Sequence, residues 1–248
     1  MFNVKIGKEY LVYQQGTSEG TQVKFKKGGY WYKLDSRGNE GLCEYLCSRL
    51  LHFSNLNPEE YVIYEQGTIN DKNGCRSQNF LNKDEELITL YRLYYNQYGL
   101  NLAEKLAEFD TLEDRIEYTL KFVYKTTGLD IFDYLRKTFM LDKIVLNEDR
   151  HVNNLALIST DKGFRPAPIF DNGKSLLTAN VSINKKLSIE ENTKRTIARP
   201  FSGSFEKTSN YFGDGFSLDY ESVFEWLNDE PDSYEKAVLE FQLKKYFG

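Results

Sequence analysis

The second half of the chain contains the polar stretch Asn147-Glu148-Asp149-Arg150-His151-Val152-Asn153-Asn154, followed at once by Leu155-Ala156-Leu157-Ile158. After a turn at residues 161–163, a second short strand is predicted over residues 168–170, directly before Asp171. An antiparallel hairpin places the start of one strand beside the end of its partner. We therefore expect Asn154 and Asp171 to lie close together at the open end of this hairpin, with Asp149 in the loop above them.

The polar side chains around this hairpin suit a magnesium site beside a hydroxyl nucleophile. Mg²⁺ prefers a few hard oxygen ligands together with water and phosphate. The carboxylate of Asp171 and the amide oxygen of Asn154 match that preference, while Asp149 is placed to orient or deprotonate a hydroxyl group. Asp, Asn and Gly are also common turn residues, so each position taken alone is equally compatible with a simple loop.

A lysine and a glutamate form a second group upstream. Lys33 lies near the end of the predicted strand 30–34, and Glu44 lies on the predicted helix 40–53, on a face shared with Cys47 and Leu51. A carboxylate on such a partly apolar face is costly unless it is paired. Lys33 is the nearest partner in sequence, and a lysine held by a glutamate can reach nucleotide phosphates.

A glycine-bounded loop, Gly16-Thr17-Ser18-Glu19-Gly20, precedes this strand and can fold its backbone N–H groups over phosphate. It is not a Walker sequence and is a weak signal by itself. The order of the parts is more informative. The parts follow one another in the order of a protein kinase: a glycine loop, a strand lysine, a helix glutamate, a helical region, Asp149 with Asn154 five residues on, and then Asp171.

The hydrophobic spacing predicts an α+β fold with two lobes, an antiparallel sheet with one helix in residues 1–80 and a mainly helical part in residues 81–248. The predicted strands of the first part are 4–13, 23–25, 30–34 and 61–69, with the helix 40–53 between them and a turn at 70–74. In the second part, helices are predicted from residue 84, over 111–127 and from 130 to about 146, then at 220–227 and 233–246, with an irregular segment at 178–217.

Composition excludes several classes of protein. The chain has 248 residues with a net charge of −5, which argues against a protein that mainly grips the phosphate backbone of nucleic acids. No apolar stretch approaches the ~18 residues of a membrane span. Three cysteines and two histidines are too few for a disulfide scaffold and argue against a zinc site, so we expect a cytoplasmic protein, although a secreted effector stays open.

Three motifs together resemble the HipA-like serine/threonine kinases, in particular the short CtkA-type kinases. They are Cys43-Glu44-Tyr45-Leu46-Cys47, Asn147-Glu148-Asp149-Arg150-His151 with Asn154, and Ala167-Pro168-Ile169-Phe170-Asp171-Asn172-Gly173. The resemblance spans roughly residues 15 to 180. It implies a two-lobed kinase fold that transfers the γ-phosphoryl group of ATP to protein serine or threonine.

The resemblance also implies roles for individual residues. Asp149 would be the catalytic aspartate, Asn154 and Asp171 would bind Mg²⁺, and Lys33 would hold the α- and β-phosphates of ATP with Glu44 as its partner. Autophosphorylation of the glycine loop is implied at Thr17 or Ser18, with Ser18 preferred. His151 follows the aspartate, unlike the eukaryotic pattern, and we interpret it as structural support that hydrogen-bonds the Asp171 loop.

The resemblance further implies a protein substrate and a small partner protein or DNA-binding antitoxin, since the chain is shorter than the full-length toxins of the family. Two alternatives stay open. The string Asp149-Arg150-His151 with Asn154 also resembles phosphoinositide kinases, so the substrate hydroxyl can belong to a lipid or small molecule. A catalytically inactive nucleotide-binding interaction module of a toxin–antitoxin type system is the other.

Overall fold

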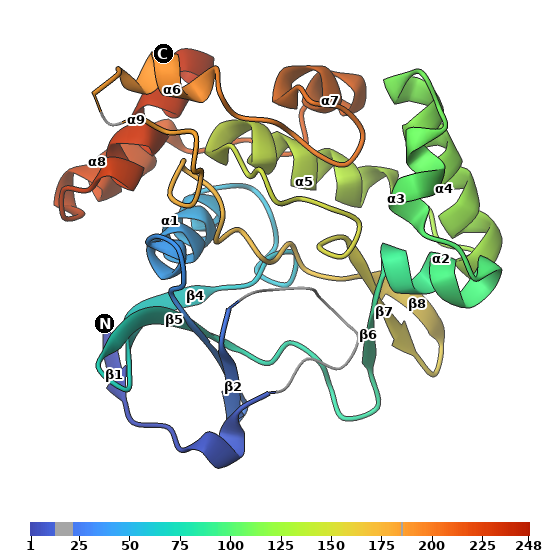
Figure 1. Cartoon of the computed structure of the whole chain (residues 1–248), viewed down its shortest axis with the longest axis horizontal. Coiled ribbons are helices and arrows are strands. Elements are labelled where there is room, and N and C mark those ends of the chain that lie inside the picture. The colour runs from blue at the N-terminus through green and yellow to red at the C-terminus, as the bar shows by residue number, and fades with distance from the viewer. Residues whose placement is uncertain (13–21, 185) are drawn as a thin grey trace.

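The computed structural model of the chain describes residues 1–12, 22–184 and 186–248. Its first part is built on a five-stranded sheet in the order β1-β4-β5-β3-β2, in which every neighbouring pair is antiparallel except the parallel pair β1–β4. The strands are β1 (Phe2–Val4), β2 (Lys24–Lys27), β3 (Tyr30–Leu34), β4 (Tyr64–Ile69) and β5 (Lys72–Gln78), and a 3₁₀ turn (Lys8–Tyr10) follows β1. Helix α1 (Glu40–His52) packs on this sheet against β4 and β5 (Figure 1).

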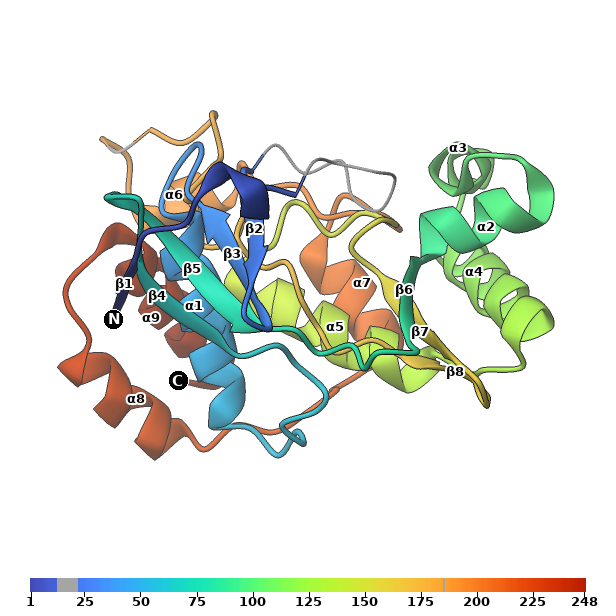
Figure 2. The ribbon, with the colours of Figure 1, turned by 90° about the horizontal axis from the view of Figure 1, so that it is seen from below.

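The second part is mainly helical and carries a small sheet of its own. Strands β6 (Glu86–Thr89), β7 (Ala156–Thr160) and β8 (Gly163–Pro166) pair antiparallel in that order. The helices are α2 (Leu90–Tyr98), α3 (Leu102–Ala107), α4 (Leu112–Thr127), α5 (Phe132–Val145), α6 (Ile189–Thr193), α7 (Phe205–Phe212), α8 (Tyr220–Asp229) and α9 (Tyr234–Phe247). Helices α2, α3 and α4 form a group at one end of the molecule, far from the N-terminal sheet (Figure 2).

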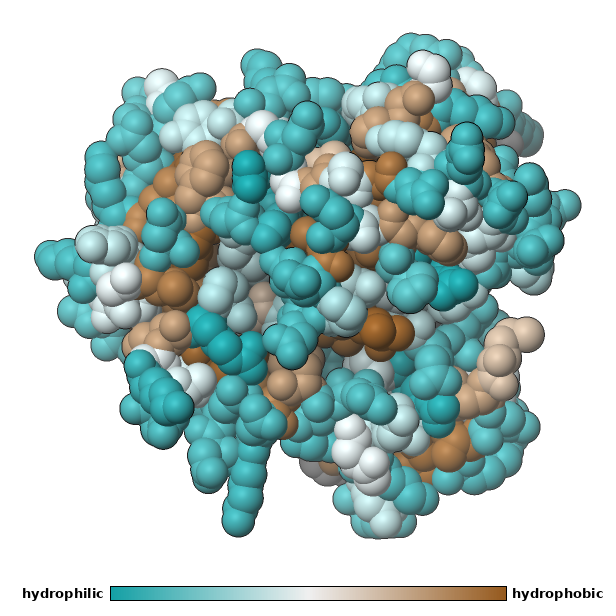
Figure 3. Space-filling view, turned by 180° about the vertical axis from the view of Figure 1, so that it is seen from behind, coloured by the Kyte–Doolittle hydropathy of each residue, from teal (hydrophilic) through white to brown (hydrophobic). Residues whose placement is uncertain are grey.

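One hydrophobic core joins the two parts. Leu46 and Leu50 of α1 belong to the same buried cluster as Leu141 and Ile144 of α5 and Leu239 of α9. Helix α1 therefore packs against the sheet on one side and against the helices of the second part on the other. In the part of the chain that the structure describes, no helix is long and apolar enough to cross a membrane. On the face seen in Figure 3, hydrophobic residues form separate areas among hydrophilic ones.

Most of the predicted helices are confirmed, and their ends follow the expected capping rules. Gly99 and Gly128 end α2 and α4 in the left-handed conformation, with φ of 69° and 73°. Thr111 caps the start of α4 by accepting a hydrogen bond from the backbone N–H of Asp114. Leu146 ends α5 with φ of 56°, where the sequence predicted a break.

Several predicted elements are wrong at their ends. Residues 86–89 form β6 instead of a helix, because they pair with β7, and the helix begins only at Leu90. The second strand of the hairpin is Gly163–Pro166 and not residues 168–170, since β8 begins directly after a tight turn at residues 161–162. Helices α6 and α7 lie in the segment 178–217 that was expected to be irregular.

Two more corrections concern the first sheet. The turn predicted at residues 70–74 contains only Asn70 and Asp71, which have φ of 51° and 65° and let β5 start at Lys72. The predicted strand 4–13 is wrong over most of its length, because β1 covers Phe2–Val4 and overlaps it at Val4 alone, and residues 8–10 form the 3₁₀ turn. The sheet also differs from the prediction, because β5, which pairs with both β3 and β4, was not predicted, and the β1–β4 pair is parallel in a sheet that was expected to be antiparallel.

The close approach of α1 to the sheet generates a stability prediction. A Cβ atom added at Gly41 would lie 2.6 Å from the backbone carbonyl carbon of Gly74 on β5. Gly41→Ala gains about 1 kcal/mol in helix propensity, but the clash with rigid backbone costs about 1–3 kcal/mol. We expect a net decrease in the free energy of unfolding, measured by urea denaturation. Gly203→Ala is the matched control, because its Cβ would have ordinary contact at 3.7 Å, and an equal effect of the two variants would contradict this account.

Candidate active site

A buried ammonium group lies where the two parts of the molecule meet. Lys33 Nζ on β3 donates hydrogen bonds to Glu44 Oε1 on α1 at 2.6 Å and to Asp171 Oδ1 at 2.9 Å. The predicted pairing of Glu44 with Lys33 is therefore confirmed. Burial alone would lower the pKa of Lys33, but the carboxylates of Asp171 and Glu44 outweigh it and raise that pKa well above its ordinary value. The lysine is thus charged in the folded protein.

Glu44 also fixes the segment that carries Asp171. The backbone N–H of Asn172 donates to Glu44 Oε2 at 2.8 Å, so one buried carboxylate holds both the lysine and the Asp171 loop. Burial would raise the pKa of Asp171, but the ammonium groups of Lys33 and Lys24 outweigh it and lower the pKa below its usual range. Asp171 has φ of 61°, a conformation that few non-glycine residues adopt, and the surrounding hydrogen bonds hold it there.

Arg150 joins the loop after α5 to the loop after the hairpin. Its guanidinium is almost fully buried and forms an ion pair with Asp142 of α5 at 3.0 Å. It also donates to the carbonyl oxygens of Asn154 at 3.1 Å and Phe170 at 2.6 Å, and to Asn172 Oδ1 at 2.5 Å. Both ends of the hairpin are thus held by one side chain, which brings the backbone beside Asn154 close to that beside Asp171.

Two asparagines shape the loop that carries Asp149. The backbone N–H of Asp149 donates to Asn147 Oδ1 at 3.1 Å, and Asn154 Nδ2 donates to the carbonyl oxygen of Asp149 at 2.9 Å. Asn154 uses its amide nitrogen in this way and is 2% exposed, yet its Oδ1 has no hydrogen-bond partner among the residues that the structure describes. A buried amide oxygen without a donor is unusual and indicates a missing partner.

A magnesium ion fits that missing partner. Hard cations take amide and carboxylate oxygens as ligands, and Asn154 Oδ1 and the carboxylate of Asp171 supply one of each. Among residues 1–12, 22–184 and 186–248, no group of three or more His, Cys, Asp or Glu residues is arranged to hold a metal ion. Asn154 Oδ1 and the Asp171 carboxylate are oxygen groups of the kind that Mg²⁺ takes when phosphate and water complete its coordination.

The site opens into a small cavity between the two parts. Its lining residues are Gln22, Lys24, Glu40, Asp149, Asp171, Gly173 and Lys174. Asp149 and Asp171 thus face one shared space, as the sequence predicted for the hairpin region. Asp149 Oδ2 is paired with the ammonium group of Lys174 at 2.8 Å.

The remaining predicted site residues are placed differently. Gly16, Thr17, Ser18 and Gly20 lie outside the described residues. His151 Nε2 lies 3.9 Å from Asp149 Oδ1, and its buried Nδ1 has no hydrogen-bond partner in the described part of the chain. The support of the Asp171 loop that was expected from His151 comes from Arg150, which sequence reasoning missed because it lies in a polar run typical of a loop. Asp142 could have indicated this role, because it is a charged residue among the apolar residues of α5 and needs a cationic partner when it is buried.

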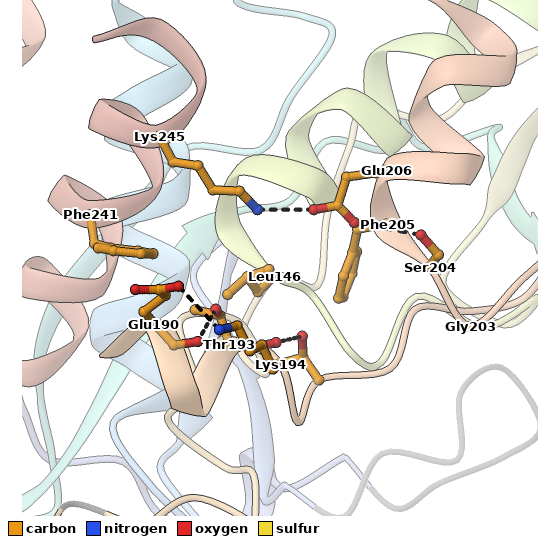
Figure 4. Close-up of a pocket in the computed structure, with 11 residues that line it drawn as sticks. Leu146, Glu190, Thr193, Lys194, Gly203, Ser204, Phe205, Glu206, Phe241 and Lys245 are labelled. Atoms are coloured by element: carbon orange, nitrogen blue, oxygen red, sulfur yellow. Dashed lines mark hydrogen bonds and ion pairs between the residues drawn. The ribbon is translucent and has the colours of Figure 1, made fainter. Parts of the chain in front are cut away.

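A second cavity, of about 320 Å³, lies between α6, α7 and α9 (Figure 4). The two lysines drawn at its wall are both paired with carboxylates, Lys194 with Glu190 at 3.1 Å and Lys245 with Glu206 at 3.0 Å. Ion pairs of this kind are satisfied without a ligand. The pocket contains none of the residues that the sequence motifs single out.

Comparisons with solved structures find proteins of similar fold. The chain is similar to the crystal structure of the Helicobacter pylori proinflammatory kinase CtkA, with a TM-score of 0.66 and 16% identity over 94% of this chain and 89% of that one. It is also similar to a chain of the Shewanella oneidensis MR-1 toxin–antitoxin complex of HipA, HipB and operator DNA, with a TM-score of 0.52 and 12% identity over 98% of this chain and 67% of that one. No protein-family model and no curated protein matches the sequence.

At these identities the likeness is one of fold. The chain has the fold of the HipA-like kinases, which confirms the predicted α+β architecture and the fold that the resemblance implies.

The buried pair of Arg150 and Asp142 generates a second stability prediction. Arg150→Met leaves the carboxylate of Asp142 buried without its partner and removes the donors of three further acceptors, so we expect a loss of about 3–5 kcal/mol in the free energy of unfolding. Arg165→Met is the control, because that side chain is 42% exposed and pairs with Glu85 at 3.0 Å, and removal of such a pair costs less than about 1 kcal/mol. Similar losses in both variants, measured by chemical denaturation, would contradict the role given to Arg150.

Proposed function

We propose that this protein is an ATP- and Mg²⁺-dependent protein serine/threonine kinase, with the nucleotide bound between residues 1–80 and 81–248. The observation that carries the proposal is the buried contact of Lys33 with both Glu44 and Asp171, beside a cavity that Asp149 also lines. A lysine held by a helix glutamate, an aspartate for the metal and a second aspartate for the hydroxyl are the parts that phosphoryl transfer needs. The fold of CtkA and HipA supports the same class of reaction.

Each of these residues has its own role in the reaction. Lys33 binds the α- and β-phosphates through its ammonium group, and Glu44 keeps that group in place. Asp149 accepts a hydrogen bond from the hydroxyl group of the substrate and takes its proton. The hydroxyl oxygen then forms a bond to the γ-phosphorus, the bond from that phosphorus to the β,γ-bridging oxygen breaks, and ADP leaves. The proton passes from Asp149 to solvent.

Asn154 and Asp171 would hold the magnesium ion. When bound there, Mg²⁺ neutralises negative charge on the phosphate oxygens. The chain itself supplies position and electrostatics, because phosphoryl transfer requires little covalent chemistry from the protein.

Partner and regulation belong to this proposal as well. The HipA structure contains HipB and operator DNA, which supports a small DNA-binding antitoxin as a partner of this chain too. We also propose that Ser18 in the glycine loop is an autophosphorylation site, with Thr17 as the alternative, and that the protein acts in the cytoplasm. Mass spectrometry of the protein after incubation with ATP and Mg²⁺ tests the modification of Ser18 directly.

The catalytic role of Asp149 is tested by Asp149→Asn. We expect the rate of phosphate transfer from radiolabelled ATP to fall by about 10²–10⁴, since the general base is lost, while ATP affinity measured by calorimetry stays close to that of the wild type. Asp161→Asn is the matched control, because Asp161 is exposed in the turn of the adjacent hairpin. Near-normal turnover of Asp149→Asn would remove Asp149 from the mechanism. Label found in lipid and absent from protein would replace the protein substrate with a lipid one.

The metal role of Asp171 is tested by Asp171→Ala. We expect the affinity for ATP in the presence of Mg²⁺ to fall about tenfold or more, because a charged ligand of the cation is lost. In EDTA, the variant should bind ATP at least as well as the wild type does, since one negative charge near the phosphates is gone. Calorimetry with and without Mg²⁺ separates the loss of the metal ligand from the loss of the negative charge. If Mg²⁺ increases the ATP affinity of the variant as much as that of the wild type, Asp171 is not a metal ligand.

A further inference from the structure

Lys174 is a charged residue of the cavity that neither the sequence motifs nor the proposed reaction uses. It follows Asp171-Asn172-Gly173, and its Nζ lies 2.8 Å from Asp149 Oδ2. The two side chains are 35% and 27% exposed, so the pair sits at the boundary between cavity and solvent. An exposed ion pair of this kind contributes little to stability, about 1 kcal/mol or less, so stability does not account for its position.

The backbone on both sides of Lys174 is anchored to α1. A Cβ atom added at Gly173 would lie 3.3 Å from Cβ of Glu40, so this segment runs directly against the helix. Ser175 is fully buried, and its carbonyl oxygen accepts a hydrogen bond from Cys43 Sγ at 3.3 Å. Lys174 is therefore a long side chain on a fixed base, which limits its ammonium group to the mouth of the cavity.

The charges around the cavity call for a further cation. The charge of Lys33 is shared by Glu44 and Asp171, and Asp149 adds another carboxylate on the same cavity. The γ-phosphate of ATP is itself anionic, and even with Mg²⁺ held at Asn154 and Asp171 it would still face the carboxylate of Asp149. Lys24 from β2 and Lys174 line this cavity too, and Lys174 is in contact with Asp149.

The small size of the cavity indicates that a side chain at its wall moves when a phosphate group enters. Its volume is about 20 Å³, which is enough for about one water molecule and too small for a phosphate group. A phosphate that reaches Asp149 must displace one of the side chains at the cavity wall. Lys174 is flexible and carries the charge that the incoming phosphate attracts.

We propose that Lys174 is a γ-phosphate-binding residue. Its ammonium group neutralises the Asp149 carboxylate while the site holds no nucleotide, and it moves to the γ-phosphate oxygens when ATP binds. The exchange frees Asp149 for the hydroxyl group of the substrate at the moment when the phosphate is in place. The inference rests on the proposed function and adds a specific contact to the third phosphate of ATP.

The test compares a diphosphate with a triphosphate. Calorimetry in Mg²⁺ measures the affinities of wild type and Lys174→Met for ADP and for the β,γ-imido analogue of ATP. We expect Lys174→Met to bind the triphosphate analogue about tenfold or more weakly and ADP as the wild type does, because one charge-assisted contact to the γ-phosphate is lost. Lys162→Met, at an exposed position in the hairpin turn, is the matched control and should bind both nucleotides normally.

Two further measurements separate this role from a structural one. Lys174→Arg retains a cation and should recover most of the affinity for the triphosphate analogue. In turnover experiments, Lys174→Met should raise the KM for ATP by a larger factor than it lowers kcat. Equal losses for ADP and the analogue, or unchanged affinity for both, would overturn the assignment of Lys174 while leaving the proposed function intact. Failure of the wild type to bind either nucleotide would instead overturn the proposed function, and this inference with it.

Discussion

The buried ammonium group of Lys33 is the constraint on which the site depends. A charge in that position is unfavourable without partners, because burial removes its hydration. Its two carboxylate partners come from different parts of the chain, Glu44 from the helix that packs on the sheet and Asp171 from the loop 138 residues further on. The need to satisfy one cation thus ties the sheet, α1 and the Asp171 loop to a single geometry.

Arg150 extends that geometry to the loop that carries Asp149. Its guanidinium is buried and forms an ion pair with Asp142 of α5. It also donates hydrogen bonds to backbone carbonyl oxygens on both sides of the hairpin. A planar cation with five donors is suited to this work, because it bonds several fixed acceptors at once. The position of Asp149 relative to Asp171 is therefore set by buried electrostatics, while both carboxylates line the cavity.

The sequence predicts the order of the site residues and the pairing of Lys33 with Glu44, because both follow from local periodicity on a strand and a helix. The contact of Lys33 with Asp171 depends on how two lobes meet, which no spacing along the chain encodes. Arg150 and Lys174 lie in polar runs that are also typical of turns, so their contacts are visible only in three dimensions. Strand β6 was missed because the helical spacing of Leu90 and Tyr94 continues backward through Leu87.

The central claim is that Lys33, Asn154, Asp171 and Asp149 surround one triphosphate. A crystal structure of the protein with the β,γ-imido analogue of ATP and Mg²⁺ tests it most directly. The account predicts phosphate oxygens within hydrogen-bond distance of Lys33 Nζ and a metal ion bound by Asn154 Oδ1 and Asp171, with the γ-phosphate on the side of Asp149. A nucleotide bound elsewhere, or this cavity still closed at saturating nucleotide, would contradict it.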